Sequence, residues 1–210
     1  MSAVEARTAR RRRGATLIRM DARDDQRFVI HNVPWDAYVA LRDALDEQRA
    51  VRMTYLDGTL ELMRPGSAHE IATKVLSRLL EAWAVERDID LRGAGSTTFR
   101  RKAKRRGIEP DECYTLGPMP DPERPHLALE VVTSNPLVDK LAVYAGLEVR
   151  EVWVWSADAI TVHALVGDTY VERDRSALLP DLHLALLASF VKPGENQTAL
   201  TKAYLAALRA

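Results

Sequence analysis

The central unit of this chain lies at residues 126–155, which read HLALEVVTSNPLVDKLAVYAGLEVREVWVW. Residues 126–133 form an apolar run that suits a buried central strand. Residues 137–146 have helical character, and Gly146 is a natural stop for that helix. Residues 150–155 alternate Val and Trp and predict the next strand. A strand, a helix and a strand in this order favour a parallel pair with a right-handed crossover.

The segment before this unit predicts a helix followed by a hairpin. A helical pattern opens at Pro34 and continues to about Gln48. Two strand patterns follow at residues 51–55 and 59–63, on either side of Asp57-Gly58. This dipeptide is the strongest short hairpin signal, so we expect the two strands to pair.

A second helix is predicted directly after the hairpin. Ser67 and Glu70 have the spacing of a capping box, with Ser67 as N-cap, and the helix ends near Arg87. The remaining expected elements are strands at 89–93, 97–101, about 109–116, 160–165 and 169–173, a connector at 118–125, mixed short structure at 178–191 and a C-terminal helix at 196–209. The sum is a single α/β domain with a mixed β-sheet flanked by α-helices.

Length and composition narrow the class of protein. The 210 residues suit one domain, and 47% apolar with 29% charged residues suit a folded core. The single cysteine, Cys113, excludes a disulfide framework and a multi-cysteine zinc site. No apolar run reaches the ~18 residues of a membrane span, and the N-terminus lacks the apolar core of a signal peptide. We therefore expect a cytoplasmic protein with no membrane partner.

Positive charge is concentrated in two places, although the 30 basic and 30 acidic residues balance over the chain. Residues 1–26 contain an arginine-rich block and are expected to form a disordered arm, either a solvated tail or a phosphate-binding arm. The domain would then span residues 27–192, with a C-terminal helix at 193–210. The second concentration, here called the basic cluster, must face solvent or a polyanion; its members are Arg100, Arg101, Lys102, Lys104, Arg105 and Arg106.

Two carboxylates occupy positions where a carboxylate is costly. Glu130 lies in the middle of the apolar strand 126–133, on the face shared with Ala128 and Val132. Burying it without a partner would cost several kcal/mol, so it needs a cation, a proton or a metal ion. Asp111 opens a strand 19 residues earlier, and pairing of the two strands would place both acids on one face. A divalent cation, Mg²⁺ or Mn²⁺, is one resolution and a core salt bridge is the other.

Three further residues are candidates for the same site. Lys140 lies early on the crossover helix, where its ammonium could orient or deprotonate a water, hold a phosphate, or remain exposed. His69 lies in the first turn of its helix, either as an ordinary helix residue or as an imidazole at the mouth of the site. Glu61 alternates with apolar neighbours and is either a surface residue or a third carboxylate.

An ordered set of short motifs joins these residues. The set comprises LDGTLELM at 56–63, Pro65, His69, GSTT at 95–98, EPDE at 109–112, LEVV at 129–132 and DKL at 139–141. It resembles the Uma-two family of restriction-endonuclease-like proteins, within the PD-(D/E)XK nuclease superfamily, from about Val33 to Val191. The resemblance implies a mixed sheet flanked by helices and a divalent metal held at the motif.

The resemblance also implies roles for individual residues. Asp111 matches the motif aspartate and Glu130 the motif acid. The usual lysine two residues after that acid is replaced by Val132, and the lysine that the family places on the following helix matches Lys140. His69 matches a histidine typical of the family, and Glu61 matches an acid found in part of it.

Two main functions follow from these observations. The first is a metal-dependent DNA endonuclease in which Asp111 and Glu130 hold Mg²⁺ or Mn²⁺, Lys140 positions the attacking water with His69 or Glu61 assisting, and the basic residues grip the backbone. A homodimer would suit the cutting of both strands. The second is a catalytically inactive nucleic-acid-binding or assembly module, favoured by Val132. A third, purely structural interpretation pairs Glu130 with Lys140 as a buried ion pair.

Overall fold

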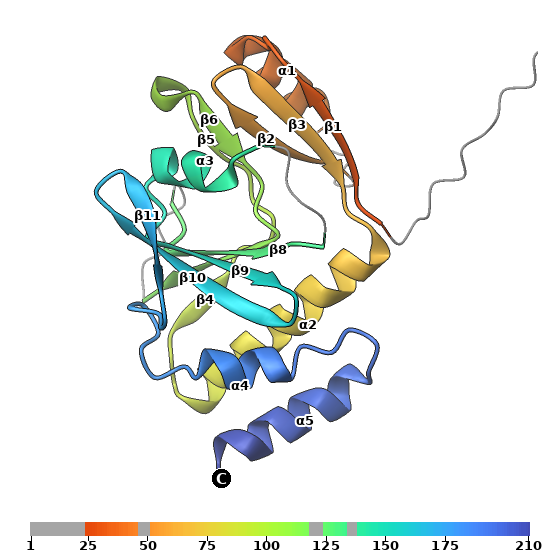
Figure 1. The fold of residues 1–210 in the computed structure, drawn as a ribbon, viewed down its shortest axis with the longest axis vertical. Helices are drawn as coiled ribbons and strands as arrows, with labels where there is room; N and C mark the ends of the chain where they lie inside the picture. The colour runs from red at the N-terminus through yellow and green to blue at the C-terminus, as the bar shows by residue number, and fades with distance from the viewer. Residues whose placement is uncertain (1–23, 46–50, 118–123, 134–137) are drawn as a thin grey trace, which may run out of the picture.

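The architecture consists of two β-sheets and five α-helices, as seen in a computed structural model that describes residues 24–45, 51–117, 124–133 and 138–210 (Figure 1). The larger sheet has six strands in the order β11-β10-β9-β8-β7-β4. Its strands are β4 (Leu91–Gly93), β7 (Glu112–Leu116), β8 (Leu127–Val131), β9 (Glu151–Ser156), β10 (Ala159–Val166) and β11 (Thr169–Arg173).

The unit at residues 126–155 is the only parallel connection among the paired strands of the described residues. β8 and β9 pair in parallel, with Leu129 opposite Trp153, and α3 (Lys140–Leu147) lies in the connection between them. The other neighbours in the larger sheet are antiparallel, including the β10–β11 meander. The mixed sheet and the α/β class are therefore confirmed.

The smaller sheet has five antiparallel strands in the order β1-β3-β2-β6-β5. Its strands are β1 (Gln26–Ile30), β2 (Arg52–Leu56), β3 (Thr59–Arg64), β5 (Phe99–Arg101) and β6 (Arg106–Ile108), and the 3₁₀ turn η1 (Lys102–Lys104) joins the last two. The β2–β3 hairpin around Asp57 and Gly58 is as predicted. The strands thus divide between two sheets, whereas the sequence indicated one.

The helices form the layers around the larger sheet (Figure 1). On one face, α2 (Ser67–Glu86), α4 (Leu184–Ser189) and α5 (Gln197–Leu208) form the main core with Leu127, Leu129 and Val131 of β8. On the other face, α3 packs between the two sheets, where Val143 and Tyr144 meet Ala128 and neighbouring strands. α1 (Trp35–Ala44) covers the smaller sheet. The alternation predicted for the β8 strand, with Glu130 on the Ala128 face, is therefore present.

Two details of the helix ends were wrongly predicted. Gly66, not Ser67, is the N-cap of α2, and Glu70 contacts Arg52 instead of closing a capping box. α3 runs through Gly146 to Leu147, and Glu148 takes the left-handed turn at its end. A Cβ at position 146 would lie 2.6 Å from Arg106 Cγ, so the glycine serves close packing instead of terminating the helix.

Several sequence predictions fall partly outside the described residues. These include most of the basic arm, the end of the helix predicted to reach Gln48, and the connector at 118–123. Within the described part, β1 begins at Gln26, at the boundary assigned to the arm, and α5 contributes Leu200 and Tyr204 to the main core. No helix in the described part of the chain combines the length and the apolar run needed to cross a bilayer.

Candidate active site

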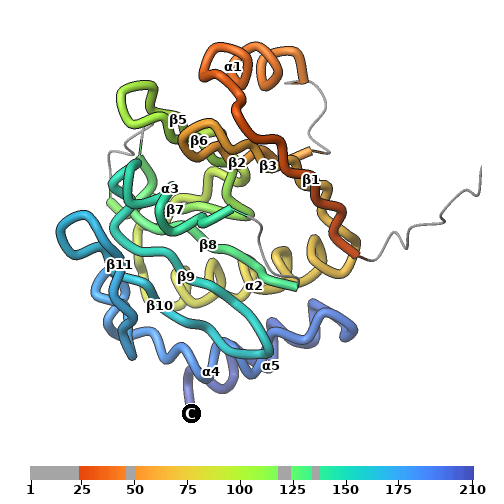
Figure 2. The backbone as a smooth tube through the Cα atoms, turned by 45° about the horizontal axis from the view of Figure 1, so that its top comes forward, coloured from red at the N-terminus to blue at the C-terminus, as the bar shows by residue number. Residues whose placement is uncertain are grey.

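Strands β7 and β8 bring Asp111 and Glu130 to the same place. Their antiparallel register pairs Glu112 with Leu129, and one further step sets Asp111 opposite Glu130. The backbone N–H of Val131 donates to Asp111 Oδ2 at 2.7 Å. Both acids are buried, and the end of β8 lies beside the first turns of α2 in the two views of the backbone (Figures 1 and 2). The two carboxylates are thus neighbours on the sheet face that α3 covers.

Helix α3 supplies two partners to Glu130. Lys140 Nζ lies 2.5 Å from Glu130 Oε2, and the Tyr144 hydroxyl donates to Oε1. The two side chains are one helical turn apart, so they leave the same face of α3. The Asp139 carboxylate caps this helix by accepting from Ala142 N at 3.0 Å, which fixes the turn that carries Lys140. The ion pair of the purely structural interpretation is therefore present.

The charges of this pair act on one another through a buried environment. Burial raises the pKa of Glu130, the Lys140 ammonium lowers it, and the Asp111 charge raises it further, so that it stays above its usual value. Burial lowers the pKa of Lys140, but Glu130 and Asp111 together hold it above its usual value. Lys140 is thus an ammonium that can orient a water or a phosphate, and it is unsuited to removing a proton.

His69 bridges two carboxylates from the first turn of α2. Its Nε2 lies 3.0 Å from Asp111 Oδ2, and its Nδ1 lies 3.3 Å from Asp25 Oδ2. Burial alone would lower the pKa of His69, but the hydrogen bonds to Asp111 and Asp25 raise it to about 9. A ring that faces an acid at both nitrogens is a doubly donating imidazolium. This contact fixes the position of Asp111. Burial alone would raise the pKa of Asp111, but the hydrogen bond from His69 and the charges of Lys140 and Arg52 hold it well below its usual range.

Among the described residues, Glu61 is linked to the site through Arg27. Its carboxylate is buried and lies 2.8 Å from Arg27, which also contacts Asp25 at 3.2 Å. Asp25 in turn accepts from Gly66 N at 3.0 Å and from Thr133 Oγ1 at 2.9 Å. We call the connected set Glu61, Arg27, Asp25, His69, Asp111 and Arg52 the buried charge network.

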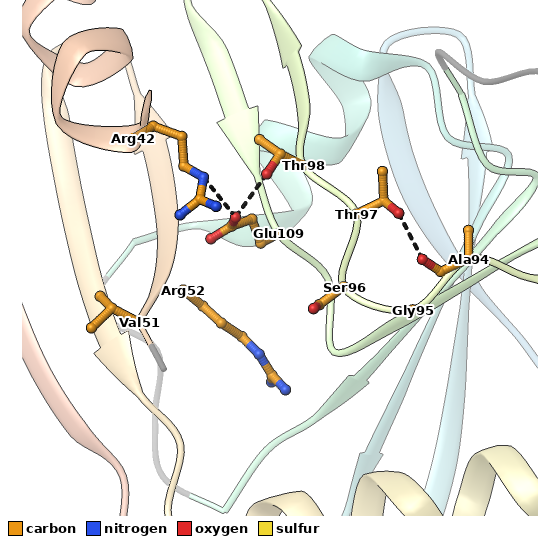
Figure 3. Close-up of a pocket in the computed structure, with 9 residues that line it drawn as sticks. All are labelled: Arg42, Val51, Arg52, Ala94, Gly95, Ser96, Thr97, Thr98 and Glu109. Carbon is orange, nitrogen blue, oxygen red and sulfur yellow. Dashed lines mark hydrogen bonds and ion pairs between the residues drawn. The ribbon is translucent and has the colours of Figure 1, made fainter. Parts of the chain in front are cut away.

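Arg52 is the member of the network nearest to open space. Its guanidinium contacts Asp111 Oδ1 through one nitrogen and Glu70 Oε1 at 2.8 Å through the other. It lines a cavity of about 360 Å³, and it also lines a second cavity of about 450 Å³ that reaches Asp111. Figure 3 shows the first cavity, where Arg42 and Thr98 converge on Glu109 while Arg52 extends away from them past Ser96. Arg52 therefore stands between the two cavities.

The basic cluster lies away from this centre. Leu56, at the far end of β2 from Arg52, pairs with Arg106. Four strand residues separate these ends by about 13 Å. Most of the cluster also has acidic partners on the surface: Arg100 with Asp43, Arg101 with Glu148, Lys102 with Asp36, and Arg106 with Asp57. The cluster is a distinct surface feature and contributes no side chain to the cavities beside Asp111.

The donor set of Asp111 and Glu130 fits a hard divalent ion in type, because such ions prefer carboxylate oxygens. In the described part of the chain, however, no group of three or more His, Cys, Asp and Glu side chains is arranged to hold a metal ion. All four carboxylate oxygens of the pair already contact donors of the chain. Asp111 and Glu130 could therefore hold a divalent ion only if one of the cationic side chains that contact them moved away.

Four residues of this centre were missed from the sequence. Tyr144 carried a usable signal, because it follows Lys140 at the spacing that shares a helix face. Asp25 and Arg27 were assigned to the arm or its edge, and Arg52 is one of many arginines in the chain. Nothing in the local pattern distinguishes these three, since apart from the Asp25–Arg27 pair their partners lie 17 to 108 residues away.

A mixed sheet whose adjacent strands bring together an aspartate and a glutamate, with a lysine beside them on the crossover helix, fits the restriction-endonuclease-like class of proteins. The chain belongs to the family described as Uma2, putative restriction endonuclease, whose model matches residues 35–191. No curated protein matches the sequence. Membership indicates nuclease activity on a nucleic acid, and restriction-endonuclease-like families generally use divalent metal ions. Asp25 and Arg27 contribute to the site from outside the matched segment.

Proposed function

We propose that the protein is an endonuclease that hydrolyses phosphodiester bonds of DNA and depends on Mg²⁺ or Mn²⁺. The supporting observation is the placement of Asp111 opposite Glu130, with Lys140 of α3 on Glu130. We place the activity in the cytoplasm, with two copies of the chain acting together when both strands are cut.

In this proposal Asp111 and Glu130 hold the ion. When bound, the ion lowers the pKa of a water and stabilises the charge that develops on the scissile phosphate. The Lys140 ammonium orients the water or the phosphate, and His69 keeps Asp111 ionised and fixed. Glu61 supports Asp25 through Arg27, which makes it a positioning residue. The basic cluster binds the backbone farther along the nucleic acid.

The test is a cleavage assay on plasmid DNA, single-stranded DNA and RNA with Mg²⁺ or Mn²⁺. Asp111→Ala and Glu130→Ala should each reduce cleavage by about 100-fold or more, a loss typical of removing a charge-stabilising group. The matched control is Asp90→Asn, an exposed acid beside β4 that pairs only with its neighbour Arg92 in the described residues. Intact substrates under all conditions, or unchanged cleavage by both variants, would contradict the proposal.

The alternative is a nucleic-acid-binding module without catalysis. Two observations favour it: Val132 stands where the superfamily usually has lysine, and donors of the chain already contact every oxygen of the acidic pair. It predicts binding that survives Asp111→Ala and weakens when the basic cluster is neutralised. Binding measured against salt concentration, in the presence of EDTA, separates it from the nuclease.

A further inference from the structure

We infer that Arg52 is a built-in counter-ion that occupies the metal-binding oxygen of Asp111 and moves to the substrate phosphate when a divalent ion binds. The inference rests on the proposed function, since it concerns the same ion and substrate. It assigns Arg52 two successive partners, a carboxylate and a phosphate. It also makes metal binding and nucleic-acid binding mutually supportive.

The two oxygens of Asp111 differ in how firmly they are held. Oδ2 accepts from the backbone N–H of Val131 at 2.7 Å and faces His69 Nε2 at 3.0 Å, and both partners are buried. Oδ1 is contacted by the guanidinium of Arg52. A backbone N–H in a sheet cannot leave, whereas a long side chain can change rotamer. Oδ1 is therefore the oxygen that a metal ion would take, and Arg52 is the group that it would displace.

Arg52 has both a second anchor and room to move. Its side chain is 11% exposed. Besides Asp111 it contacts His69 Nε2 at 3.2 Å and Glu70, whose side chain is 53% exposed. It lines cavities of about 360 and 450 Å³, and Asp111 also lines the larger one. The path of the side chain along the first cavity is visible in Figure 3. Leaving Asp111 thus exposes the acid while Arg52 keeps its contact with Glu70.

Lys140, the cation that contacts Glu130, is less able to leave. It lies at the first turn of α3, which the Asp139 cap holds, and its ammonium contacts Glu130 at 2.5 Å. Its ammonium also interacts electrostatically with Asp111, so one cation stays near the pair after Arg52 has moved.

A guanidinium that moves into these cavities could bind a phosphate of the nucleic acid. Arginine forms paired hydrogen bonds with phosphate oxygens, which match its planar fork. A divalent ion adds two positive charges next to Lys140 and His69, and repulsion then favours the departure of Arg52 from Asp111. The phosphate of a nucleic acid offers the arginine a new negative partner at the same moment. Metal affinity should consequently be low without nucleic acid and higher with it.

The test is calorimetric titration of Mn²⁺ into the full chain and its variants without nucleic acid. Arg52→Gln should bind Mn²⁺ at least tenfold more tightly than the wild type, because the competing cation is gone. The matched control is Arg42→Gln, which removes another arginine that lines the first cavity, pairs with Glu109 and lies outside the buried charge network. It should change the Mn²⁺ affinity less than threefold. Cleavage by Arg52→Gln should fall in spite of tighter metal binding, since the phosphate loses its arginine.

Each alternative result has a definite meaning. One outcome is that Arg52→Gln binds Mn²⁺ no more tightly than the wild type, while Asp111→Ala does not bind Mn²⁺ at all. This overturns the inference and leaves the proposed nuclease intact. Equal tightening by Arg42→Gln shows a general charge effect and also overturns it. No Mn²⁺ binding by either protein, together with no cleavage, removes both proposals. If Arg52→Gln does not fold, Arg52→Lys is used in its place. A second measurement follows the guanidinium NMR signal of Arg52 in the wild type while Mg²⁺ is added. A signal that does not change would contradict the inference.

Discussion

At the residue scale, the centre of the protein is a set of buried charges that compensate one another. Glu130 and Lys140 form a pair whose side chains are 3% and 13% exposed, and Asp111 is held by a backbone N–H, His69 and Arg52. Buried ion pairs add little net stability, but removing one partner leaves an uncompensated charge. The arrangement therefore holds these charged groups inside the protein, where the proposed metal-dependent reaction would use them.

The Glu130–Lys140 pair gives a direct prediction on stability. Lys140→Met should lower the free energy of unfolding by about 3–5 kcal/mol, because Glu130 is left with Tyr144 as its partner. The double variant Lys140→Met with Glu130→Gln should recover part of that loss. Urea unfolding of the four proteins of this cycle measures the coupling. Additive losses would show that the two groups do not interact.

His69 gives a prediction on pH. Its pKa is raised from the usual 6.5 to about 9, so its contribution to stability is fully present below pH 6.5 and is lost as the pH rises to 9. The loss is at most about 3 kcal/mol, from 1.36 kcal/mol per pKa unit. The free energy of unfolding, measured at pH 6, 7.5 and 9, should fall more steeply in the wild type than in His69→Gln. Parallel curves would mean that His69 does not bind its proton more tightly in the folded state.

At the element scale, the sequence predicted the helices and long strands better than their ends. Local sequence signals mark the β2–β3 hairpin, the β8–α3–β9 crossover and the β10–β11 meander. Each signal is a turn dipeptide or a segment whose apolar residues recur with one period. The strand β6 has none, since it is three residues long and contains Arg106 and Gly107. A strand this short forms because a neighbouring strand offers backbone groups for hydrogen bonding. The periodicity of the sequence contains no information about that neighbour.

The N-terminal turn of α3 links an element to the site. Asp139→Ala removes the hydrogen bond to Ala142 N and should lower the free energy of unfolding by about 1 kcal/mol. It should also reduce cleavage several-fold, because the turn that carries Lys140 loosens. The matched control is His183→Ala, which removes the cap of α4 on the opposite side of the sheet. A similar loss of stability without a loss of cleavage is expected there, and equal effects on cleavage would contradict the role of the α3 turn.

At the scale of the whole molecule, two sheets meet around α3, and the site forms where their ends converge. The smaller sheet supplies Arg27, Arg52 and Glu61, and the larger one supplies Glu130. The basic cluster lies at the other end of β2, so a nucleic acid that touched both would extend across the face of the smaller sheet. The fold therefore separates the candidate active site from the surface proposed to bind phosphate.

The salt dependence of nucleic-acid binding tests this separation. Arg101→Gln with Lys102→Gln should reduce the slope of log affinity against log salt by up to about 0.9 for each phosphate that the variant no longer neutralises. Ion pairs with Glu148 and Asp36 reduce the effect, because these acids already neutralise part of the charge. The control is Arg150→Gln with Arg173→Gln, one residue just before β9 and one on β11, and it should leave the slope unchanged. Equal slopes for all three proteins would exclude the basic cluster from the interface.

The sequence alone determined the class of fold, the crossover at residues 126–155 and the presence of a carboxylate that needed a partner. These follow from local periodicity and from the cost of burying a charge, both of which are properties of a segment. Only the tertiary structure decided which partners meet: Tyr144 and Lys140 on Glu130, and His69 and Arg52 on Asp111. Ion pairs between distant segments depend on sheet register and helix docking, because a charge acts through space and not along the chain.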